Sequence, residues 1–284
     1  MASMDPRPTA AQRPIHLKIA DDLRMEIERG ELREGDSLPT LEQIRERWRC
    51  STNSARGAIN LLKSQGLIVT GRGKPAVVRT PPGKVVRSSD RHQAEKDLAA
   101  EPEEQRRTVG EAETNLGMSI THQRFTSAYD TIEAGTELGD LFGIAPTASV
   151  LRRHYEATDE QTGHLLSFST SYMPVALVEA NPALLDERNE PWPGGTQHQL
   201  ATVGIEVMTI LDKVTGRMPT TVEGQIWGLP DGVPLLICRR ISLDAEDRNV
   251  EISDATYPAD RTELRFITPL QQWTQKPDDW NLGR

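Results

Sequence analysis

The stretch STNSARGAINLLKSQGLIVTGRGK, residues 51–74, combines the pattern of a helix with that of a β-hairpin. Apolar residues recur at positions 55, 58, 59 and 62, which is the spacing of one face of an α-helix, and Gly66 predicts where that helix ends. Two β-prone runs, Leu67–Val69 and Ala76–Val78, flank a glycine-containing turn. Because glycine readily adopts the positive φ of tight hairpin turns, we predict two paired strands with a basic tip.

Two further helices are predicted upstream of this stretch. The segment His16–Arg29 places apolar residues at positions 17, 20, 23 and 27 on one helical face, and Gly30 follows it. Thr40 and Gln43 have the spacing of a capping box, in which each side chain satisfies a free backbone N–H at a helix start. Three helices followed by a hairpin are the elements of a winged helix-turn-helix.

The distribution of charge indicates a polyanionic partner for this part of the chain. The 284 residues carry a formal net charge of −9. Eleven Lys and Arg residues but only two acidic residues lie from Arg45 to Arg91, which gives this segment a charge of +9 and leaves −18 for the remainder. Such a contrast is typical of one domain that meets a polyanion and another that does not, although an uneven solvated surface would look the same.

Composition excludes several other classes of protein. Charged residues make up 26% of the chain, and no apolar run approaches the length of a membrane span. The first residues lack an apolar signal core, so we expect a disordered tail over residues 1–13. Cys50 and Cys238 are too few for a disulfide framework and have no metal-ligand spacing. We therefore expect a cytoplasmic protein of two domains with neither a metal nor another cofactor.

The polar face of the helix in residues 51–74 carries side chains suited to reading DNA. Asn53, Arg56, Gly57 and Asn60 recur opposite its apolar face. Asn and Arg pair bidentately with adenine and guanine, and a small Gly57 would allow a close approach to the duplex. A helix face that only contacts solvent is also polar, so the interpretation depends on the neighbouring helix and hairpin. Phosphate and minor-groove contacts are expected from Ser51, Thr52, Ser54, Arg72 and Lys74.

Beyond residue 80 the sequence turns polar and then becomes mixed α/β. Residues 81–115 are rich in Glu, Gln and Arg with little periodicity, and we interpret them as a linker that is helical in part at most. Capping-box spacings at Thr196–Gln199 and Thr220–Glu223 predict two helices. Five strands are predicted from β-prone runs at Val150–Tyr155, Leu165–Tyr172, Ile205–Leu211, Leu235–Ile241 and Val250–Tyr257.

An internal repeat is indicated within this C-terminal part. GIAPTASVLRRHY from Gly143 aligns with GLPDGVPLLICRR from Gly228 at an offset of 85 residues, and the same offset pairs Tyr172 with Tyr257. Any turn followed by a strand can produce a weak match of this kind. The tyrosine pair lies far from the aligned segments and favours a pseudo-twofold repeat. We predict that both tyrosines line one pocket.

The N-terminal residues resemble the GntR family of bacterial transcription regulators. The similarity runs from PIHLKIADDLRMEIERGELREGDSLPT to LLKSQGLIVTGRGKPAVV, with GELxxGDxLP and LxxxGLI as its strongest markers. It implies a DNA-binding domain over residues 14–80. The family usually has arginine where this chain has Glu42 and Thr52, so the operator is expected to differ from common family sites. The expected DNA contacts are Thr40, Glu42, Arg49, Ser51, Thr52, Asn53, Ser54, Arg56, Asn60, Arg72 and Lys74.

The C-terminal part resembles the UTRA effector-binding domain of the HutC subfamily, through LSFSTSYMP, the repeat and ADRTELRF. The resemblance implies an α+β chain, with a winged helix-turn-helix, the linker, a chorismate-lyase-like mixed α/β domain over residues 116–274 and a tail at 275–284. It also implies a small-molecule effector. The family often has a second arginine at the position of Tyr155, which disfavours a phosphorylated or strongly anionic effector. The implied effector contacts are Arg153, Tyr155, Thr170, Tyr172, Glu251 and Tyr257.

Two other functions fit parts of the sequence. Similarity to chorismate lyase suggests an enzyme, but neither G-x-S-x-G nor H-E-x-x-H occurs, and fold resemblance does not carry activity. His154 and His164 could be acid–base groups or ordinary surface histidines. Glu42 and Thr52 leave open a ligand-binding protein that has lost DNA recognition. We expect a homodimeric, effector-responsive transcription regulator, a repressor rather than an activator, that binds double-stranded operator DNA and no membrane.

Overall fold

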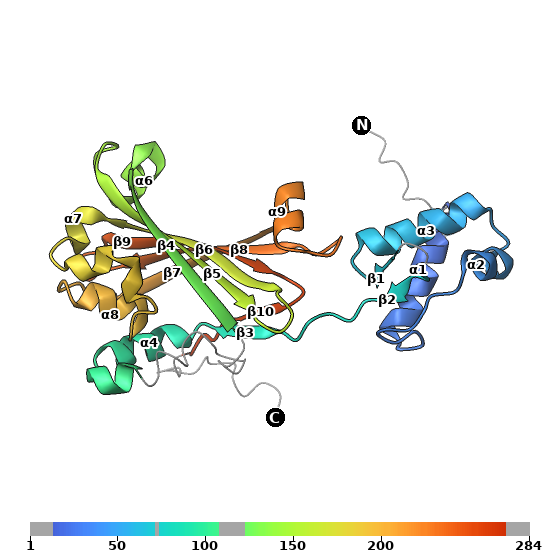
Figure 1. Ribbon diagram of the computed structural model, residues 1–284, viewed down its shortest axis with the longest axis horizontal. Coiled ribbons are helices and arrows are strands. Elements are labelled where there is room, and N and C mark those ends of the chain that lie inside the picture. Colours follow the sequence, from blue (N-terminus) through green and yellow to red (C-terminus); the bar gives the residue numbers. More distant parts are fainter. Residues whose placement is uncertain (1–13, 72–73, 108–122, 271–284) are drawn as a thin grey trace, which may run out of the picture.

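The computed structural model describes residues 14–71, 74–107 and 123–270. The chain forms two domains joined by an extended segment near residues 79–84 (Figure 1). Within the described residues, no helix combines the length and the hydrophobicity that crossing a membrane requires.

The N-terminal domain has the predicted three helices and hairpin. Its helices are α1 (Ile15–Glu28), α2 (Leu41–Trp48) and α3 (Thr52–Ser64). Strand β1 (Ile68–Val69) pairs antiparallel with β2 (Val77–Val78). The core is formed by Ile19, Ala20, Leu23, Leu38, Ile44, Ala55, Ala58, Leu62, Ile68 and Val78.

Local sequence signals explain where these helices begin and end. Thr40 Oγ1 accepts a hydrogen bond from the Gln43 N–H, and Gln43 Oε1 accepts one from the Thr40 N–H, so the predicted capping box is confirmed. Gly66 has a φ of +71° just beyond α3, as expected at a helix end. The predicted face of α1 needs one correction, because Leu17 is exposed and Ile19 is buried instead.

A six-stranded antiparallel sheet forms the centre of the C-terminal domain, in the order β4-β5-β6-β9-β8-β7. The edge strand β4 was not predicted, because its sequence QRFTSAYDTIE lacks a clear alternation of apolar and polar residues. The strands are β4 (Gln123–Glu133), β5 (Ser149–Asp159), β6 (Leu165–Pro174), β7 (Thr209–Arg217), β8 (Leu235–Leu243) and β9 (Asn249–Pro258).

Helices of this domain lie between the strands in sequence. Hydrophobic residues of α7 and α8 pack against Leu151 and Met173, and the face of the sheet that carries these two residues is called the covered face below. The helices are α6 (Gly135–Phe142), α7 (Val175–Val178), η3 (Pro182–Leu185), η4 (Glu187–Asn189), α8 (Gly195–Ala201) and α9 (Thr221–Ile226).

The internal repeat is present as a structural unit. The order strand, helix, strand, strand occurs twice, as β4-α6-β5-β6 and as β7-α9-β8-β9. The repeat does not bring the two tyrosines together. Tyr172 lies opposite Ile252, whereas Tyr257 lies an odd number of residues further along β9, so their side chains point to opposite faces. The prediction that both line one pocket is therefore wrong.

The segment interpreted as a linker contains secondary structure that belongs to the C-terminal domain. Strand β3 (Val85–Ser88) pairs in parallel with β10 (Thr262–Arg265), and helix α4 (Arg91–Ala99) packs against α8. Helix α4 was not predicted, because its apolar content is low and Leu98 is its only buried residue. Residues 108–115 lie outside the described residues.

Two other local predictions differ from the structure. The strand predicted at Ile205–Leu211 begins only at Thr209 and continues to Arg217. The helix predicted to start at a Thr196 capping box begins two residues earlier, with Gly194 at its N-cap in the left-handed region. The capping box at Thr220 is confirmed.

The two domains touch where α3 ends. Lys63 Nζ lies 2.8 Å from Asp231 Oδ2, and Arg79 Nη1 donates to Asp260 Oδ2 at 3.0 Å. A Cβ at Gly232, whose φ is +78°, would lie 2.3 Å from the Gly66 backbone nitrogen. Only glycine permits this approach of the loop between α9 and β8.

Candidate functional site

The outward face of α3 presents three unengaged polar side chains. Ala55, Ala58 and Leu62 face the core and leave Asn53, Arg56 and Asn60 exposed. Within the described part of the chain, these three side chains make no hydrogen bond or ion pair. They lie at i, i+3 and i+7, so one side of the helix can offer two amides and a guanidinium to an external partner.

The remaining predicted DNA contacts surround this face. Thr40 and Ser51 have exposed positions but use their hydroxyl oxygens to cap α2 and α3. Ser54 shares a hydrogen bond with Ser51, and Glu42 is exposed on α2. Thr52 is half-buried at the first position of α3.

The turn between α2 and α3 exposes a basic residue. Arg49 closes α2 with a left-handed φ of 48°, which is uncommon for a residue other than glycine. Arg47, by contrast, donates to Glu26 and lies 4.3 Å from the Trp48 ring centre. These contacts hold Arg47 against α1. Arg49 in the turn has no hydrogen bond or ion pair of its side chain to any described residue.

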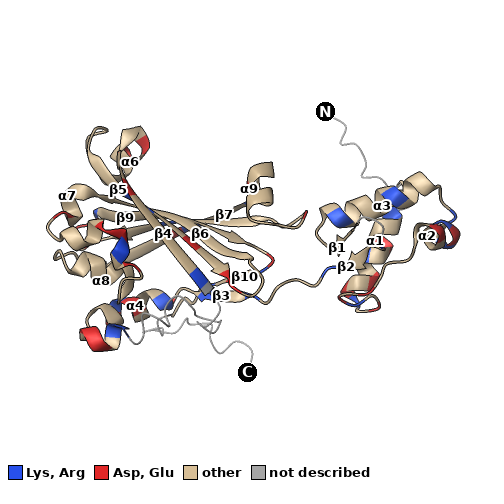
Figure 2. Ribbon diagram, in the orientation of Figure 1, with Lys and Arg blue, Asp and Glu red and all other residues tan. Residues whose placement is uncertain are grey.

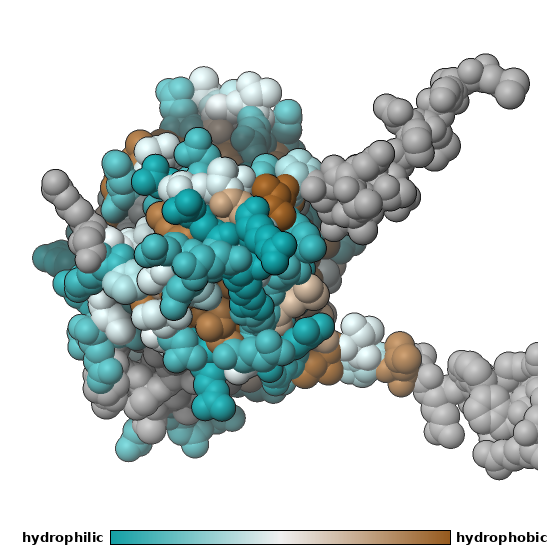
Figure 3. Space-filling view, turned by 90° about the vertical axis from the view of Figure 1, so that its right-hand side faces the viewer, coloured by the Kyte–Doolittle hydropathy of each residue, from teal (hydrophilic) through white to brown (hydrophobic). Residues whose placement is uncertain are grey.

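Gly57 does not lie on the exposed face. A Cβ at this position would lie 3.4 Å from His16 Cβ, so the small residue accommodates α1 rather than DNA. Lys74 is exposed at the hairpin, and Arg72 lies outside the described residues. Lys and Arg residues occur along α3, and the side of the N-terminal domain that points away from the C-terminal domain is mainly hydrophilic (Figures 2 and 3).

A row of polar residues crosses the covered face of the C-terminal sheet. Each member lies directly opposite the next on the neighbouring strand. The row therefore reaches from one edge strand to the other and supplies both charges and hydroxyls. In order from β4 to β7 its members are Tyr129, Arg153, Ser171, Ser253, Arg240 and Asp212.

Arg153 is the centre of a buried polar network. Its side chain is 1% exposed and forms an ion pair with Glu251 at 2.9 Å. It also donates to Ser171 Oγ at 2.7 Å and to Gln199 Oε1 at 2.5 Å. Although burial opposes it, the proximity of Tyr155 and Glu251 raises the pKa of Arg153, so the guanidinium stays charged.

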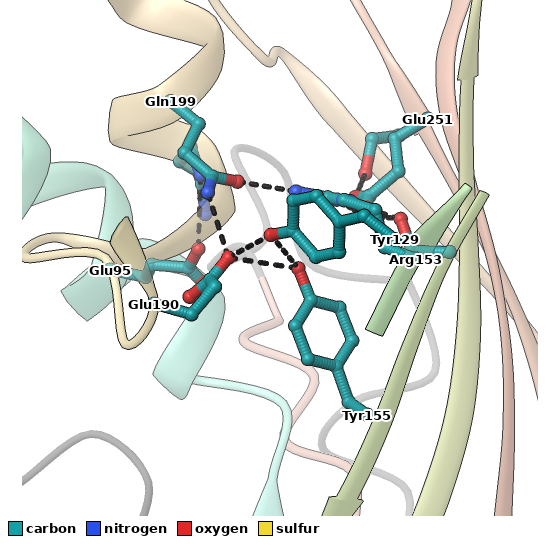
Figure 4. A network of polar contacts seen from close by, with 10 residues as sticks. Glu95, Tyr129, Arg153, Tyr155, Glu190, Gln199 and Glu251 are labelled. Atoms are coloured by element: carbon teal, nitrogen blue, oxygen red, sulfur yellow. Dashed lines mark hydrogen bonds and ion pairs between the residues drawn. The ribbon is translucent and has the colours of Figure 1, made fainter. Parts of the chain in front are cut away.

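Glu190 connects two tyrosines to α8. Figure 4 shows its carboxylate at the point where the Tyr129 and Tyr155 hydroxyls meet. Tyr155 donates to Glu190 at 2.9 Å, Gln199 Nε2 donates to it at 3.0 Å, and Tyr129 also donates to it. Burial raises the pKa of Tyr129 to about 12, so its phenol remains protonated at neutral pH.

A polar cavity of about 160 Å³ lies beside this network, and we call it the effector cavity because two of the effector contacts expected from the sequence line it. Tyr155, Glu251 and four serines contribute to its walls, and Arg240 lines it from β8. Helix α4 closes one side with His92 and Glu95. Burial raises the pKa of Glu95, whose carboxylate accepts a hydrogen bond from the Gln197 N–H at 3.1 Å.

The structure separates the predicted effector residues into two groups. Arg153, Tyr155, Glu251 and Tyr257 point to the covered face. Thr170 and Tyr172 point to the other face, so their assignment to this site is wrong. Side chains alternate between the two faces along β5 and β6, so the pairing register of these strands decides which residues share a face. This register is not visible in the sequence.

Sequence reasoning missed the contributions of other elements. Glu190 lies in a loop, Arg240 was assigned no role, and His92 and Glu95 lie in the presumed linker. No motif marked them, because they reach the site through tertiary packing.

The histidines considered as acid–base groups lie elsewhere. His154 Nδ1 is 3.0 Å from Thr170 Oγ1 on the face opposite the effector cavity. His164 lines a separate cavity beside the N-terminal domain. Within residues 14–71, 74–107 and 123–270, no three His, Cys, Asp or Glu residues gather where they could hold a metal ion.

Comparison with known proteins finds two matching families. The family described as bacterial regulatory proteins, gntR family, matches residues 16–78, and the UTRA domain matches residues 128–263. No curated protein matches the chain.

Solved structures of similar proteins extend over both domains. The crystal structure of a candidate GntR-family transcriptional regulator is 25% identical, covers 92% of this chain and 99% of its own, and gives a TM-score of 0.65. PhnF from Mycobacterium smegmatis is 18% identical, with 89% and 100% covered and a TM-score of 0.47.

Proposed function

We propose that the chain, whose N-terminal domain matches the gntR family of bacterial regulatory proteins and which carries a UTRA domain, is a homodimeric repressor of the HutC subfamily. In this proposal it acts in the cytoplasm, binds double-stranded operator DNA through α3, and responds to a small molecule in the effector cavity. It catalyses no reaction.

The observation that carries this proposal is the exposed face of α3. Asn53, Arg56 and Asn60 lack partners in the described chain, and these side-chain types match the hydrogen-bonding edges of adenine and guanine in the major groove. The free N–H groups at the start of α3 and the exposed Arg49 can bind phosphates and fix the register. Lys74 of the hairpin would lie at the adjoining minor groove.

Binding to the promoter region beside the protein's own gene tests this function. The full chain should shift this DNA while heparin, a sequence-independent polyanion, is present as competitor. If heparin displaces the protein from this DNA as completely as from unrelated DNA, the result would instead favour a ligand-binding protein that has lost sequence recognition.

The effector is proposed to be a small polar molecule. Arg153 is already paired with Glu251 and Arg240 with Asp212, so the cavity wall offers mainly hydroxyl groups and neutralised charges. Effector binding would shift the dimer between two geometries that differ in how well they match adjacent half-sites. A coupling free energy of about 1–3 kcal/mol is enough to change operator occupancy several-fold.

The dimer is proposed to form through β7 and α9. Strand β7 is an edge of the sheet, so its outer backbone groups can pair with a second copy. Exposed apolar side chains beyond the end of β7 extend this proposed interface. Met218 is 55% exposed, Val222 62% and Ile226 73%. Val222 and Ile226 lie at i and i+4 on one face of α9.

Replacing both Val222 and Ile226 by aspartate is therefore expected to convert the dimer to a monomer. Charges placed in an apolar contact would have to be desolvated on association. Analytical ultracentrifugation gives the mass of each species. Leu185→Asp, at an exposed apolar residue of η3, is the matched control and should stay dimeric. A dimer that survives the double substitution would place the interface elsewhere.

Glu42→Arg is expected to change the preferred operator sequence. A carboxylate facing the groove can accept from cytosine N4 and repels phosphate, whereas arginine favours guanine. Selection from a random DNA pool by the two proteins measures this change. Glu46→Arg, at another exposed position of α2, controls for the added charge. Identical enriched motifs from wild type and Glu42→Arg would show that Glu42 does not face the groove.

A further inference from the structure

A second, smaller cavity adjoins the effector cavity where β3 and α4 meet the sheet. Its volume is about 20 Å³, which is room for roughly one water-sized group. His92 and Arg240 line both cavities. The residues from Arg87 to His92 contribute much of the wall, and we call this space the linker cavity.

Positive charge dominates the linker cavity. Among the described residues that line it, Asp212 is the one carboxylate, and it is already bonded to Arg240 at 2.8 and 3.0 Å. Within the described residues, the Arg91 side chain has no hydrogen bond or ion pair, and Arg87 only stacks on the Tyr257 ring at 4.5 Å. Two charges therefore lack a counter-ion among the described residues. The lining arginines are Arg87, Arg91, Arg240 and Arg265.

Unpaired hydrogen-bond donors gather at the same place. Six buried side-chain nitrogen or oxygen atoms lack a partner in the described residues, and three of them belong to residues that line this cavity. They are Arg87 Nε and Ser88 Oγ, which can donate a hydrogen, and His92 Nε2, which donates in one of its two tautomers. Buried donors without partners are rare in folded proteins, so their concentration here indicates a missing acceptor.

The ionisation of these groups agrees with a missing anion. Burial, followed by the proximity of Arg240 and Arg87, lowers the pKa of Arg91. Burial also lowers the pKa of His92, whose Nε2 is 3.6 Å from Asp212 Oδ2. A bound negative charge would offset both effects.

We propose that the linker cavity binds one oxygen of a carboxylate carried by the effector, while the rest of the molecule occupies the effector cavity. This inference rests on the proposed function, because it takes the larger cavity as the effector site. Arg87, Arg91 and Ser88 donate to the oxygen. The space holds about one oxygen atom, so a carboxylate fits there and a phosphate, with three terminal oxygens, does not.

The position of this subsite gives it a regulatory consequence. Arg87 and Ser88 lie on β3 and Arg91 on α4, in the segment that follows directly on the N-terminal domain. Arg240 lies on the sheet. A ligand held at its carboxylate by β3 and α4, with its remainder against Arg240 and Ser242 of β8, would tie the start of the C-terminal domain to the sheet. It would so restrict where the N-terminal domains can lie.

Three matched compounds test the charge of the bound group. The probes 4-hydroxybutyrate, 1,4-butanediol and 4-aminobutan-1-ol share a four-carbon chain and one hydroxyl, and their other end is anionic, neutral or cationic. Calorimetric titration of the full chain at constant ionic strength gives each dissociation constant. We expect 4-hydroxybutyrate to bind at least about tenfold more tightly than the other two, since only its end group can form an ion pair with Arg87 and Arg91.

Arg91→Gln should reduce this preference to about threefold or less. Arg124→Gln is the matched control, because Arg124 is exposed on the opposite face of the sheet, and it should keep the preference. Without ligand, Arg91→Gln should unfold at the same temperature as wild type or a higher one, because it removes repulsion between like charges.

Three results would overturn the subsite. They are no preference for the anion in wild type, a preference that Arg91→Gln leaves unchanged, and a loss of thermal stability in Arg91→Gln beyond that of Arg124→Gln, which would make Arg91 structural. Operator binding by wild type, measured in parallel, separates this inference from the proposed function. If operator DNA is bound without an anion preference, only the subsite fails.

Discussion

Glu251→Leu is expected to destabilise the C-terminal domain by about 3–5 kcal/mol. The substitution leaves the Arg153 guanidinium, which is 1% exposed, without its ion-pair partner. It also removes the acceptor for Ser171 Oγ at 2.6 Å. A buried charge without compensation costs more than the pair itself contributes, so the loss should exceed that of an ordinary surface substitution. Urea unfolding followed by circular dichroism measures the change.

The double substitution Arg153→Met with Glu251→Leu is the matched control. It replaces the buried pair with apolar side chains of similar size and should recover most of the lost stability. A single Glu251→Leu variant as stable as wild type would show that Arg153 reaches solvent or another acceptor, contrary to the network in Figure 4.

Arg56→Ala is expected to weaken operator binding by about 1–3 kcal/mol, roughly a 5- to 150-fold rise in the dissociation constant. Arg56 is exposed in the middle of the polar face of α3, and its side chain makes no hydrogen bond or ion pair within the described chain. If it reads a guanine, the variant should also lose discrimination at one base pair in each half-site. Competition binding with operators altered at single positions measures both effects.

Arg29→Ala provides the matched control, because Arg29 is exposed at the C-terminal end of α1, away from the centre of α3. An equal loss on every DNA sequence would make Arg56 a phosphate contact. If Arg56→Ala bound the operator with full affinity, α3 would not be the recognition helix.

The N-terminal domain could be predicted almost completely because its signals are local. The Thr40 capping box, the apolar spacing of α3 and Gly66 each act within a few residues. Predictions failed where packing between distant segments of the chain determines which way a residue points. Gly57 appeared to face DNA, but its nearest neighbours place it against His16 of α1.

The candidate effector site was predictable only in part. Arg153 and Glu251 were found through family resemblance, and the structure joins them in one ion pair. Tyr172 was assigned to the wrong face of the sheet. A repeat offset of 85 residues cannot reveal that the side chains of Tyr172 and Tyr257 point to opposite faces. Glu95 could not have been found, since a polar helix of nine residues gives no sign of which domain it packs against.

Selection of binding sites from random double-stranded DNA by the full chain tests the central claim most directly. The protein should enrich one motif made of two half-sites in twofold relation, as expected for a dimer that places one α3 in each of two major grooves. It should bind this motif at least about 10³-fold more tightly than unrelated DNA at the same salt concentration. A pool without an enriched motif, bound with uniform affinity, would contradict sequence-specific recognition by α3.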